Sequence, residues 1–434
     1  MILSTKQHET IHQRLLMLFS FLLPLHPRLA ILCIIFCGLN WLLRGAFFRN
    51  FKLLIQPLPL LFIGFYFLHW VGMIYTSNWT EGLQRLETKL PLLIFPLILF
   101  SFPLKKEETT LQNFSKNNSI APILISFVIG CFVASMYCIS CGVLKYFETG
   151  ENWMYYKLLG DFLGFHPTYF SMYISFALFI VLFFLVKNYK TISVKNKLSF
   201  ALLIGWFFLF ILLLSSRMTI LATALILGFS FLTWMYLNGK LVKGLGISLI
   251  GIVLLGISLK TLPGLKTRTN ATIQRVEQQS KKQGVSDPRV NLWSAAMTVI
   301  SQNPIIGTGT GDSQDELVKI YKKNNYEREL RDNYNPHNQF LQTTVTLGVI
   351  GGVLLLIYLL VPFWMAFQQG DYLYLLFLAL VILSCLTESI LQTQRGTLFF
   401  GFFHSLFVMR LLTLRSQKNK KKTILSKKTA SQII

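Results

Sequence analysis

The chain has 434 residues, of which 53% are hydrophobic and only 14% are charged, and its formal net charge is +23. Soluble domains carry about a quarter charged residues, so this composition excludes an ordinary soluble protein. Most hydrophobic residues stand in runs of about 17–25 residues, the length that crosses a bilayer as a helix. The sequence therefore predicts an all-α polytopic membrane protein.

About twelve apolar runs are candidates for transmembrane helices. They lie near residues 13–26, 28–43, 54–75, 89–103, 120–144, 162–186, 198–216, 218–237, 243–260, 338–366, 372–393 and 396–414. Nine of these runs precede one long polar interval, and three follow it. The predicted organisation is spans 1–9 in residues 1–260, a partly helical loop over 261–336, spans 10–12 in 337–414, and a basic tail over 415–434.

The placement of basic residues predicts how the spans are oriented. If the N-terminus is cytoplasmic, the segments on that side hold about three times as many Lys and Arg residues as the short segments on the other side. This is the positive-inside signature, so we predict cytoplasmic termini and a periplasmic polar interval. Most of the net charge is then an orientation signal, which argues against a nucleic-acid partner. The basic run 415–428 either contacts anionic lipid headgroups or stays solvated.

Two segments in the first half of the chain combine polar and apolar residues. Residues 82–90 place three leucines at helical spacing, so the segment is either an amphipathic helix at the outer interface or a plain connector. Asp161 and His166 stand near the start of the sixth span. They either face a substrate groove or cap that helix, and we favour the cap.

Residues 198–237 form an apolar run that is too long for one span. Its only break is Ser215-Ser216-Arg217, so the run is predicted to be two spans that turn there. An arginine at this outer turn could simply snorkel to the interface, as a lysine would. The planar guanidinium is also the better ligand for a phosphate, so Arg217 is a candidate functional residue.

The polar interval carries eleven Lys or Arg residues and eight Asp or Glu residues between 261 and 336, a net charge of +3. A groove with this balance would attract an anionic ligand. Arg268, Arg275 and Arg289 lie in this interval and are candidates to bind such a ligand.

The sequence around Arg289 predicts a helix start. Asp287 is a suitable N-cap, and Pro288 suits the first helical position. Arg289 would then lie in the first turn, where unpaired backbone N–H groups already favour anions. A positive charge opposes the helix dipole there, so Arg289 is either a tolerated exposed charge or part of a phosphate clamp.

Alternating glycines follow this helix, at Gly307, Gly309 and Gly311. They would allow a tight turn and a close approach of the backbone to a ligand. The pattern is neither a Walker loop nor a Rossmann loop, so it is a weak nucleotide signal. The acidic residues that begin at Asp312 are more typical of a helix N-terminus than of a metal site.

Asn335-Pro336-His337 suggests another helix start, at the tenth span. Asn335 would cap, Pro336 would open the helix, and His337 would lie in its first turn. The positive helix end should keep His337 neutral, and a neutral histidine at the water–membrane boundary is a competent general base. The alternative is a histidine that merely suits the interface.

These motifs together resemble the O-antigen ligase/polymerase superfamily of bacterial membrane glycosyltransferases. The resemblance rests on an arginine after a serine pair between two spans, on Arg289-x-x-x-Trp293 with Pro304-x-x-Gly307-x-Gly309, and on Pro336-His337-Asn338-x-x-Leu341 leading into a span. It covers most of the chain, because span count, topology and loop position also agree.

The resemblance implies transfer of a glycan from an undecaprenyl-diphosphate carrier to an acceptor hydroxyl at the periplasmic face of the bacterial inner membrane. It implies an inverting reaction that needs no metal, cofactor or nucleotide sugar. Arg217 and Arg289 would hold the diphosphate, and His337 would take the proton of, or orient, the attacking hydroxyl. The further candidates for substrate binding are Arg268, Arg275, Gly307, Gly309 and Asn338.

The motifs do not distinguish between two classes of acceptor. A ligase uses a sugar of the lipid A core, whereas a polymerase uses the end of another lipid-linked glycan, and we favour the ligase. Membrane lipids are the other expected partners. A secondary transporter or flippase is a remote alternative, because it would place paired charges or broken helices at the midplane of two matching halves.

Overall fold

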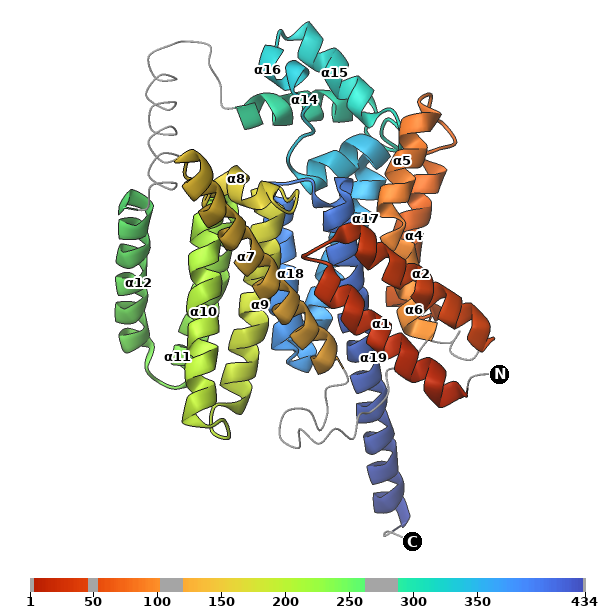
Figure 1. Cartoon of the computed structure of the whole chain (residues 1–434). Helices are drawn as coiled ribbons and strands as arrows, with labels where there is room; N and C mark the ends of the chain where they lie inside the picture. Colours follow the sequence, from red (N-terminus) through yellow and green to blue (C-terminus); the bar gives the residue numbers. More distant parts are fainter. Residues whose placement is uncertain (1–3, 46–53, 102–119, 262–287, 432–434) are drawn as a thin grey trace.

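The computed structural model describes residues 4–45, 54–101, 120–261 and 288–431, and every regular element in these ranges is a helix. The helices form an elongated bundle with a small helical cap at one end (Figure 1). The predicted all-α membrane architecture is confirmed. Seven of the described helices are long and apolar enough to cross a bilayer, and two shorter helices are also apolar. The exact number of spans stays a prediction.

Each predicted apolar run corresponds to one helix of the bundle. These helices are α1 (Thr5–Leu22), α2 (Pro27–Arg44), α4 (Pro57–Val71), α6 (Pro91–Ser101), α7 (Ala121–Thr149), α9 (Pro167–Asn188), α10 (Val194–Leu214), α11 (Arg217–Leu237), α12 (Leu241–Thr261), α17 (Gln339–Gln369), α18 (Tyr372–Cys385) and α19 (Gln394–Ser431). The remaining elements are α5 (Trp79–Lys89), α8 (Tyr156–Asp161), α14 (Pro288–Gln302), α15 (Ser313–Lys323), α16 (Glu327–Arg331) and the short 3-10 helix η1 (Ile390–Gln392).

The core of the bundle lies around α9 and α19. Within the apolar part of each helix, 78% of α9 and 89% of α19 is buried, more than in the other long apolar helices. Phenylalanine rings join them: Phe176 of α9 packs edge-to-face on Phe403 of α19, and Phe377 of α18 contacts both. Such ring pairs add packing energy to their burial, so these helices are fixed relative to one another.

The long apolar run turns where the sequence predicted. α10 ends at Leu214, Ser215 adopts a left-handed conformation with φ of 51°, and Ser216 is the N-cap of α11. Arg217 is therefore the first residue of α11. Residues 79–89 also form a helix, α5, which contains most of the predicted amphipathic segment.

The predicted cap of the sixth span is wrong for Asp161, and for His166 it is right only in position. Asp161 is the last residue of the short helix α8, five residues before α9 begins its own cap. His166 occupies the N-cap position of α9, but its side chain forms no capping hydrogen bond. Pro167, at the first helical position, lacks an N–H group and has a helical φ, which is sufficient to start the helix.

The helix α17 is broken at Gly348, which has a φ of 66° and a ψ of −168°. The break deprives carbonyl groups before it and N–H groups after it of their helical partners. The loop that follows α14 pairs with them. The hydrogen bonds run from Thr308 N to Val345 O (2.9 Å), from Gly309 N to Thr346 O (3.0 Å), from Val349 N to Pro304 O (2.8 Å) and from Ile350 N to Ile305 O (3.5 Å).

This pairing corrects the role predicted for the alternating glycines. Gly307 and Gly309 have φ values of 72° and 95°. A Cβ on Gly307 would collide with the backbone N of Gly348, and a Cβ on Gly309 would lie 2.6 Å from Oγ1 of Thr76. The glycines therefore allow the loop to approach the chain's own backbone, and the space that we had assigned to a ligand is filled.

The Gly348→Ala variant should be substantially less stable than the wild type. A methyl group there would meet the carbonyl of Ile305, and a left-handed conformation costs an alanine on the order of 1–2 kcal/mol by itself. Gly228→Ala in α11 is the control, because a Cβ there meets no atom within 4 Å. Thermal unfolding in detergent should show a lower midpoint for Gly348→Ala only. Equal midpoints for both variants would contradict this account of the break.

Candidate functional site

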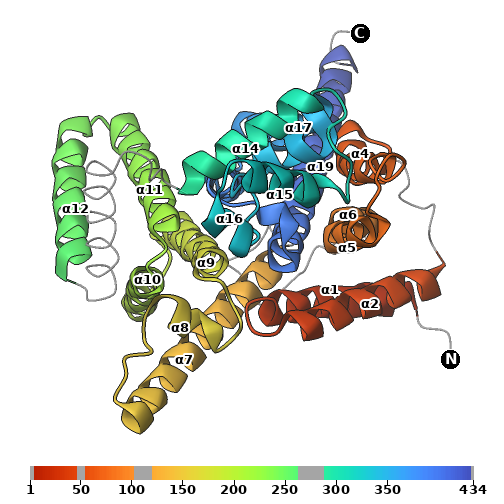
Figure 2. The same cartoon turned by 90° about the horizontal axis from the view of Figure 1, so that it is seen from above.

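The cap formed by α14, α15 and α16 covers one end of the bundle, and it lies over α17 and α19 when seen from above (Figures 1 and 2). α14 and α15 pack on each other and on the first part of α17 around a small apolar cluster. This cluster consists of Leu292, Ala295, Ala296, Val299, Leu317, Ile320, Tyr321 and Val345. The cap is thus a packed unit that is joined directly to α17.

Arg289 lies in the first turn of α14, as predicted, and is partly buried. Four residues further on, Trp293 donates a hydrogen bond from Nε1 to the carbonyl of Pro336 (3.1 Å). Residues four apart lie on the same face of a helix. Arg289 therefore shares the face of α14 that meets the turn carrying His337. Asp287, the predicted N-cap, lies outside the described residues, as do Arg268 and Arg275.

His337 is not in the first turn of a helix, so that prediction is wrong. The N-cap of α17 is Asn338, whose Oδ1 accepts hydrogen bonds from the N–H groups of Phe340 (2.9 Å) and Leu341 (3.1 Å). His337 has a φ of 46°, a left-handed conformation that cannot continue into a right-handed helix. Asn335 accepts from His337 N (2.9 Å) and so closes the turn before the helix.

Strained backbone of this kind is often found at functional sites. His337 has such a backbone, and its ring packs edge-to-face near the ring of Tyr334, with 5.3 Å between centroids. Its side chain is 30% exposed, so a ligand can reach the imidazole.

Glu388 is the residue of the site that sequence reasoning missed. Its Oε2 lies 3.1 Å from Nδ1 of His337, and its side chain is 14% exposed. Its Oε1 lies 3.5 Å from the hydroxyl of Thr168 at the start of α9. The sequence holds one usable signal, an acidic residue directly after the apolar run of α18. Fifty-one positions separate it from His337, and no periodicity links them.

Asn338, predicted to bind substrate, has structural partners in the protein. Its side chain is buried, its Oδ1 caps α17, and its Nδ2 donates to the carbonyl of Leu386 (3.3 Å). The next residue, Gln339, accepts from Leu391 N (2.7 Å). These bonds attach the start of α17 to the connection between α18 and α19, residues 386–393.

Arg217 lies at the same end of the bundle as His337. α9, α10 and α11 are joined by short turns and run in alternating directions, so α9 and α11 begin at the same end (Figure 1). The two helices are tied by a hydrogen bond from Thr223 to Ser175 (2.8 Å). Thr168, at the start of α9, is the residue that contacts Glu388. Arg217 is exposed.

A second group of cations meets the other side of the α18–α19 connection. Arg85 Nη1 (3.4 Å) and Lys89 Nζ (3.3 Å) both contact Oε1 of Gln392, and Arg85 also pairs with Glu81 (2.7 Å). Lys89 is 1% exposed. The pKa of Lys89 is lowered from 10.5 to about 7, chiefly by burial and then by the nearby Arg85 charge, whereas Glu81 opposes the shift.

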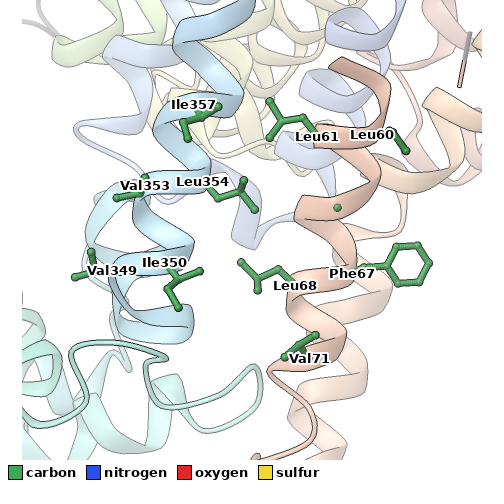
Figure 3. Close-up of a pocket in the computed structure, with 11 residues that line it drawn as sticks. Leu60, Leu61, Phe67, Leu68, Val71, Val349, Ile350, Val353, Leu354 and Ile357 are labelled. Atoms are coloured by element: carbon green, nitrogen blue, oxygen red, sulfur yellow. The ribbon is translucent and has the colours of Figure 1, made fainter. Parts of the chain in front are cut away.

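An apolar groove of about 670 Å³ lies between α4 and the second part of α17. Leu61 and Leu68 point across it toward Leu354 and Ile350 (Figure 3). All of its lining residues are apolar or glycine, and none is a candidate site residue. A groove of this kind suits a hydrocarbon chain and offers a sugar no hydrogen-bond partner, so the candidate glycan site lies elsewhere.

The acidic segment after the glycines is a helix N-terminus, as predicted. Asp312 is the N-cap residue of α15, and its carboxylate accepts hydrogen bonds from the N–H groups of Ser77 (2.8 Å) and Asn78 (2.7 Å). Asn78 also donates to Asp315 (2.9 Å). These carboxylates therefore attach the cap to the start of α5. In the part of the chain that the structure describes, no three His, Cys, Asp or Glu side chains are grouped to hold a metal ion.

Comparison with known proteins supports the resemblance found in the motifs. A sequence model of the O-antigen ligase family matches residues 200–356. The chain is also 29% identical over 140 residues to an uncharacterised protein of Haemophilus influenzae, an alignment that covers 30% of this chain and 34% of that protein. The chain thus spans about a third of the length of this curated relative. The family match confirms the resemblance to the O-antigen ligase superfamily, and its range includes Arg217, Arg289 and His337.

Replacing the buried ammonium should change how stability depends on pH. The folded pKa of Lys89 is below its unfolded value, so the unfolded chain binds more protons between pH 7 and 10.5. The free-energy cost of burying the charged Lys89 ammonium is fully present below about pH 7 and disappears as the pH rises toward 10.5. Lys89→Met should therefore stabilise the protein most at pH 7 and below, and flatten the rise toward alkaline pH.

The measurement is the thermal midpoint in detergent across this pH range. Lys323→Met, at an exposed position of α15, is the control and should keep the wild-type pH dependence. If Lys89→Met and wild type differ by the same amount at every pH, Lys89 is not a buried, titrating group.

Proposed function

We propose that this chain is a membrane glycosyltransferase that moves a glycan from undecaprenyl diphosphate to an acceptor hydroxyl, with the lipid A core as the acceptor. The proposal depends mainly on one observation, that the family match and the structure select the same three residues. The region that matches the O-antigen ligase family contains Arg217, Arg289 and His337. Arg217 and Arg289 lie in the first turns of α11 and α14, His337 lies just before α17, and these helices begin at one end of the bundle. The matching family is that of the O-antigen ligase, which favours ligation over polymerisation.

The two arginines are suited to bind the diphosphate. Arg217 is the first residue of α11, and Arg289 is the second residue of α14. Each arginine therefore lies in the first turn of a helix, where backbone N–H groups are unpaired, and both kinds of donor favour a phosphate. As the glycosyl bond breaks, negative charge grows on the departing diphosphate. Donors that are already in place stabilise that charge without reorganisation.

His337 is suited to act on the acceptor. Its imidazole is partly accessible, and it lies beside a carboxylate at the boundary between bundle and cap. In the proposed reaction it takes the proton of the acceptor hydroxyl as the oxygen attacks the anomeric carbon. Attack from the face opposite the diphosphate inverts that carbon. The donor already has a good leaving group, so positioning, charge stabilisation and a base are sufficient chemistry, without a metal.

The charge distribution supports a proposed location. We propose that the cap and the three site residues face the periplasm, with both termini in the cytoplasm of a bacterium and the bundle in its inner membrane. The excess of Lys and Arg in the segments on the opposite side supports this orientation.

The break in α17 does not favour transport. Broken helices in transporters leave backbone groups that bind ions or substrates. In α17 the groups at the break are paired with residues 304–309 of the chain itself. They are therefore not available to a transported ion.

The variants His337→Ala, Arg289→Ala and Arg217→Ala should each lose transfer while their protein levels stay normal. Loss of one phosphate ligand should cost about 2–4 kcal/mol of transition-state stabilisation, or roughly 30- to 1,000-fold in rate. Arg331→Ala is a matched control, because Arg331 lies in the cap but is exposed and pairs with its neighbour Asp332. Near-normal transfer by one of the three variants would remove the role proposed for that residue.

The assay is transfer from a defined undecaprenyl-diphosphate glycan to purified lipid A core by the full-length protein in liposomes. A product on the lipid A core supports ligation. A ladder of longer glycans on the carrier lipid would instead identify a polymerase, which uses the same donor. Translocation of the donor without any new glycosidic bond would contradict both.

A further inference from the structure

The contact between His337 and Glu388 gives the imidazole a defined orientation. Nδ1 of His337 lies 3.1 Å from Oε2 of Glu388, within hydrogen-bond distance. The other ring nitrogen, Nε2, is on the opposite edge of the ring from this contact. Glu388 is 14% exposed and His337 is 30% exposed, so the carboxylate lies deeper than the ring that it orients.

Hydrogen bonds between residues next to His337 and residues next to Glu388 fix the relative position of the two side chains. Asn338 donates to the carbonyl of Leu386, two residues before Glu388, and Gln339 accepts from Leu391 N, three residues after it. Glu388 N also bonds to the carbonyl of Ser384 at the end of α18 (2.9 Å). The residues that follow His337 are therefore fastened on both sides of Glu388, which fixes the relative position of ring and carboxylate.

We propose that Glu388 is a positioning residue that acts through His337 in glycan transfer, an inference that rests on the function proposed above. A carboxylate beside Nδ1 accepts the hydrogen bond of Nδ1–H. This leaves the lone pair of the neutral ring on Nε2, which becomes the atom that accepts a proton. The carboxylate also stabilises the imidazolium that forms, as in other carboxylate–histidine pairs.

In the proposed step, proton transfer to His337 accompanies transfer of the glycan to the acceptor. The acceptor O–H bond breaks, and its proton moves to Nε2 of His337. The oxygen forms a bond to the anomeric carbon of the donor glycan as the bond from that carbon to the diphosphate oxygen breaks. The electron pair of that bond leaves with undecaprenyl diphosphate. Nε2 then gives its proton to water or to the released diphosphate, which restores the neutral ring beside the Glu388 carboxylate.

A merely structural role for Glu388 would operate through α9. Its second oxygen lies 3.5 Å from the hydroxyl of Thr168, which could tie the start of α9 to the α18–α19 connection. That distance is long for an oxygen–oxygen hydrogen bond, whereas the contact with His337 has ordinary length. The geometry therefore gives the stronger contact to the imidazole.

The test compares Glu388→Gln, Glu388→Asp and Glu388→Ala in the full-length protein in liposomes, with kcat and the donor KM measured separately. The amide of Gln can still accept from Nδ1–H but has no charge. We expect kcat to fall about 10- to 100-fold in Glu388→Gln and further in Glu388→Ala, with the donor KM nearly unchanged. Glu388→Asp keeps the charge and should lie between wild type and Glu388→Gln.

A double variant separates positioning from structure. If Glu388 acts through His337, adding Glu388→Gln to His337→Ala should cause no further loss in single-turnover transfer. Glu148→Gln, an exposed carboxylate near the end of α7, is the control and should keep wild-type kcat. Thermal midpoints in detergent show whether the Glu388 variants are folded. If Glu388→Gln is not folded, Glu388→Asp takes its place in the comparison with His337→Ala.

Two results would overturn the inference. One is a wild-type kcat in folded Glu388→Gln, and the other is a loss that multiplies with that of His337→Ala. Either result leaves the proposed function intact as long as His337→Ala itself keeps only a small residual rate. A His337→Ala variant with near-wild-type transfer would instead refute the base assigned to the proposed function.

Discussion

Backbone N–H and C=O groups inside an apolar bundle have no water to pair with, so each must find a partner in the protein. This constraint is most demanding at Gly348, where α17 breaks, and residues 304–309 meet it with four hydrogen bonds. The cap is therefore attached to the bundle by backbone pairing as well as by side-chain packing. Because the first part of α17 also begins directly after His337, the same pairing determines where that histidine stands.

The α18–α19 connection completes the site from the other side. It accepts a hydrogen bond from Asn338, donates one to Gln339, and carries Glu388 to the imidazole of His337. Just after the connection, at the start of α19, Arg395 donates to the carbonyl of Leu163 (2.6 Å) and stacks over a phenylalanine ring. Several elements thus converge on one short segment. Such a framework can hold a histidine and a carboxylate at a fixed separation, which proton transfer requires.

The proposed chemistry divides into two tasks that different elements perform. The arginines at the starts of α11 and α14 would neutralise a departing diphosphate, and the pair of His337 and Glu388 would receive a proton. Trp293 links these tasks, because it holds α14 against the turn that precedes His337. A reaction in which charge develops at two places needs both groups of residues in a fixed arrangement, and the packed cap would fix Arg289 relative to His337.

Local composition and residue order were enough to predict several parts of this protein. Long apolar runs are sufficient to predict helices, the pair Ser215-Ser216 is sufficient to predict a turn, and Pro288 is sufficient to start α14. Arg217, Arg289 and His337 could be selected because an unusual residue at a helix or span boundary is visible in the chain itself. Tertiary structure alone decided the partner of His337, the start of α17 at Gln339, the burial of Lys89 and the role of the glycines. Each of these depends on contacts between segments far apart in the chain. A local sequence pattern cannot predict which distant backbone group or carboxylate a residue will contact.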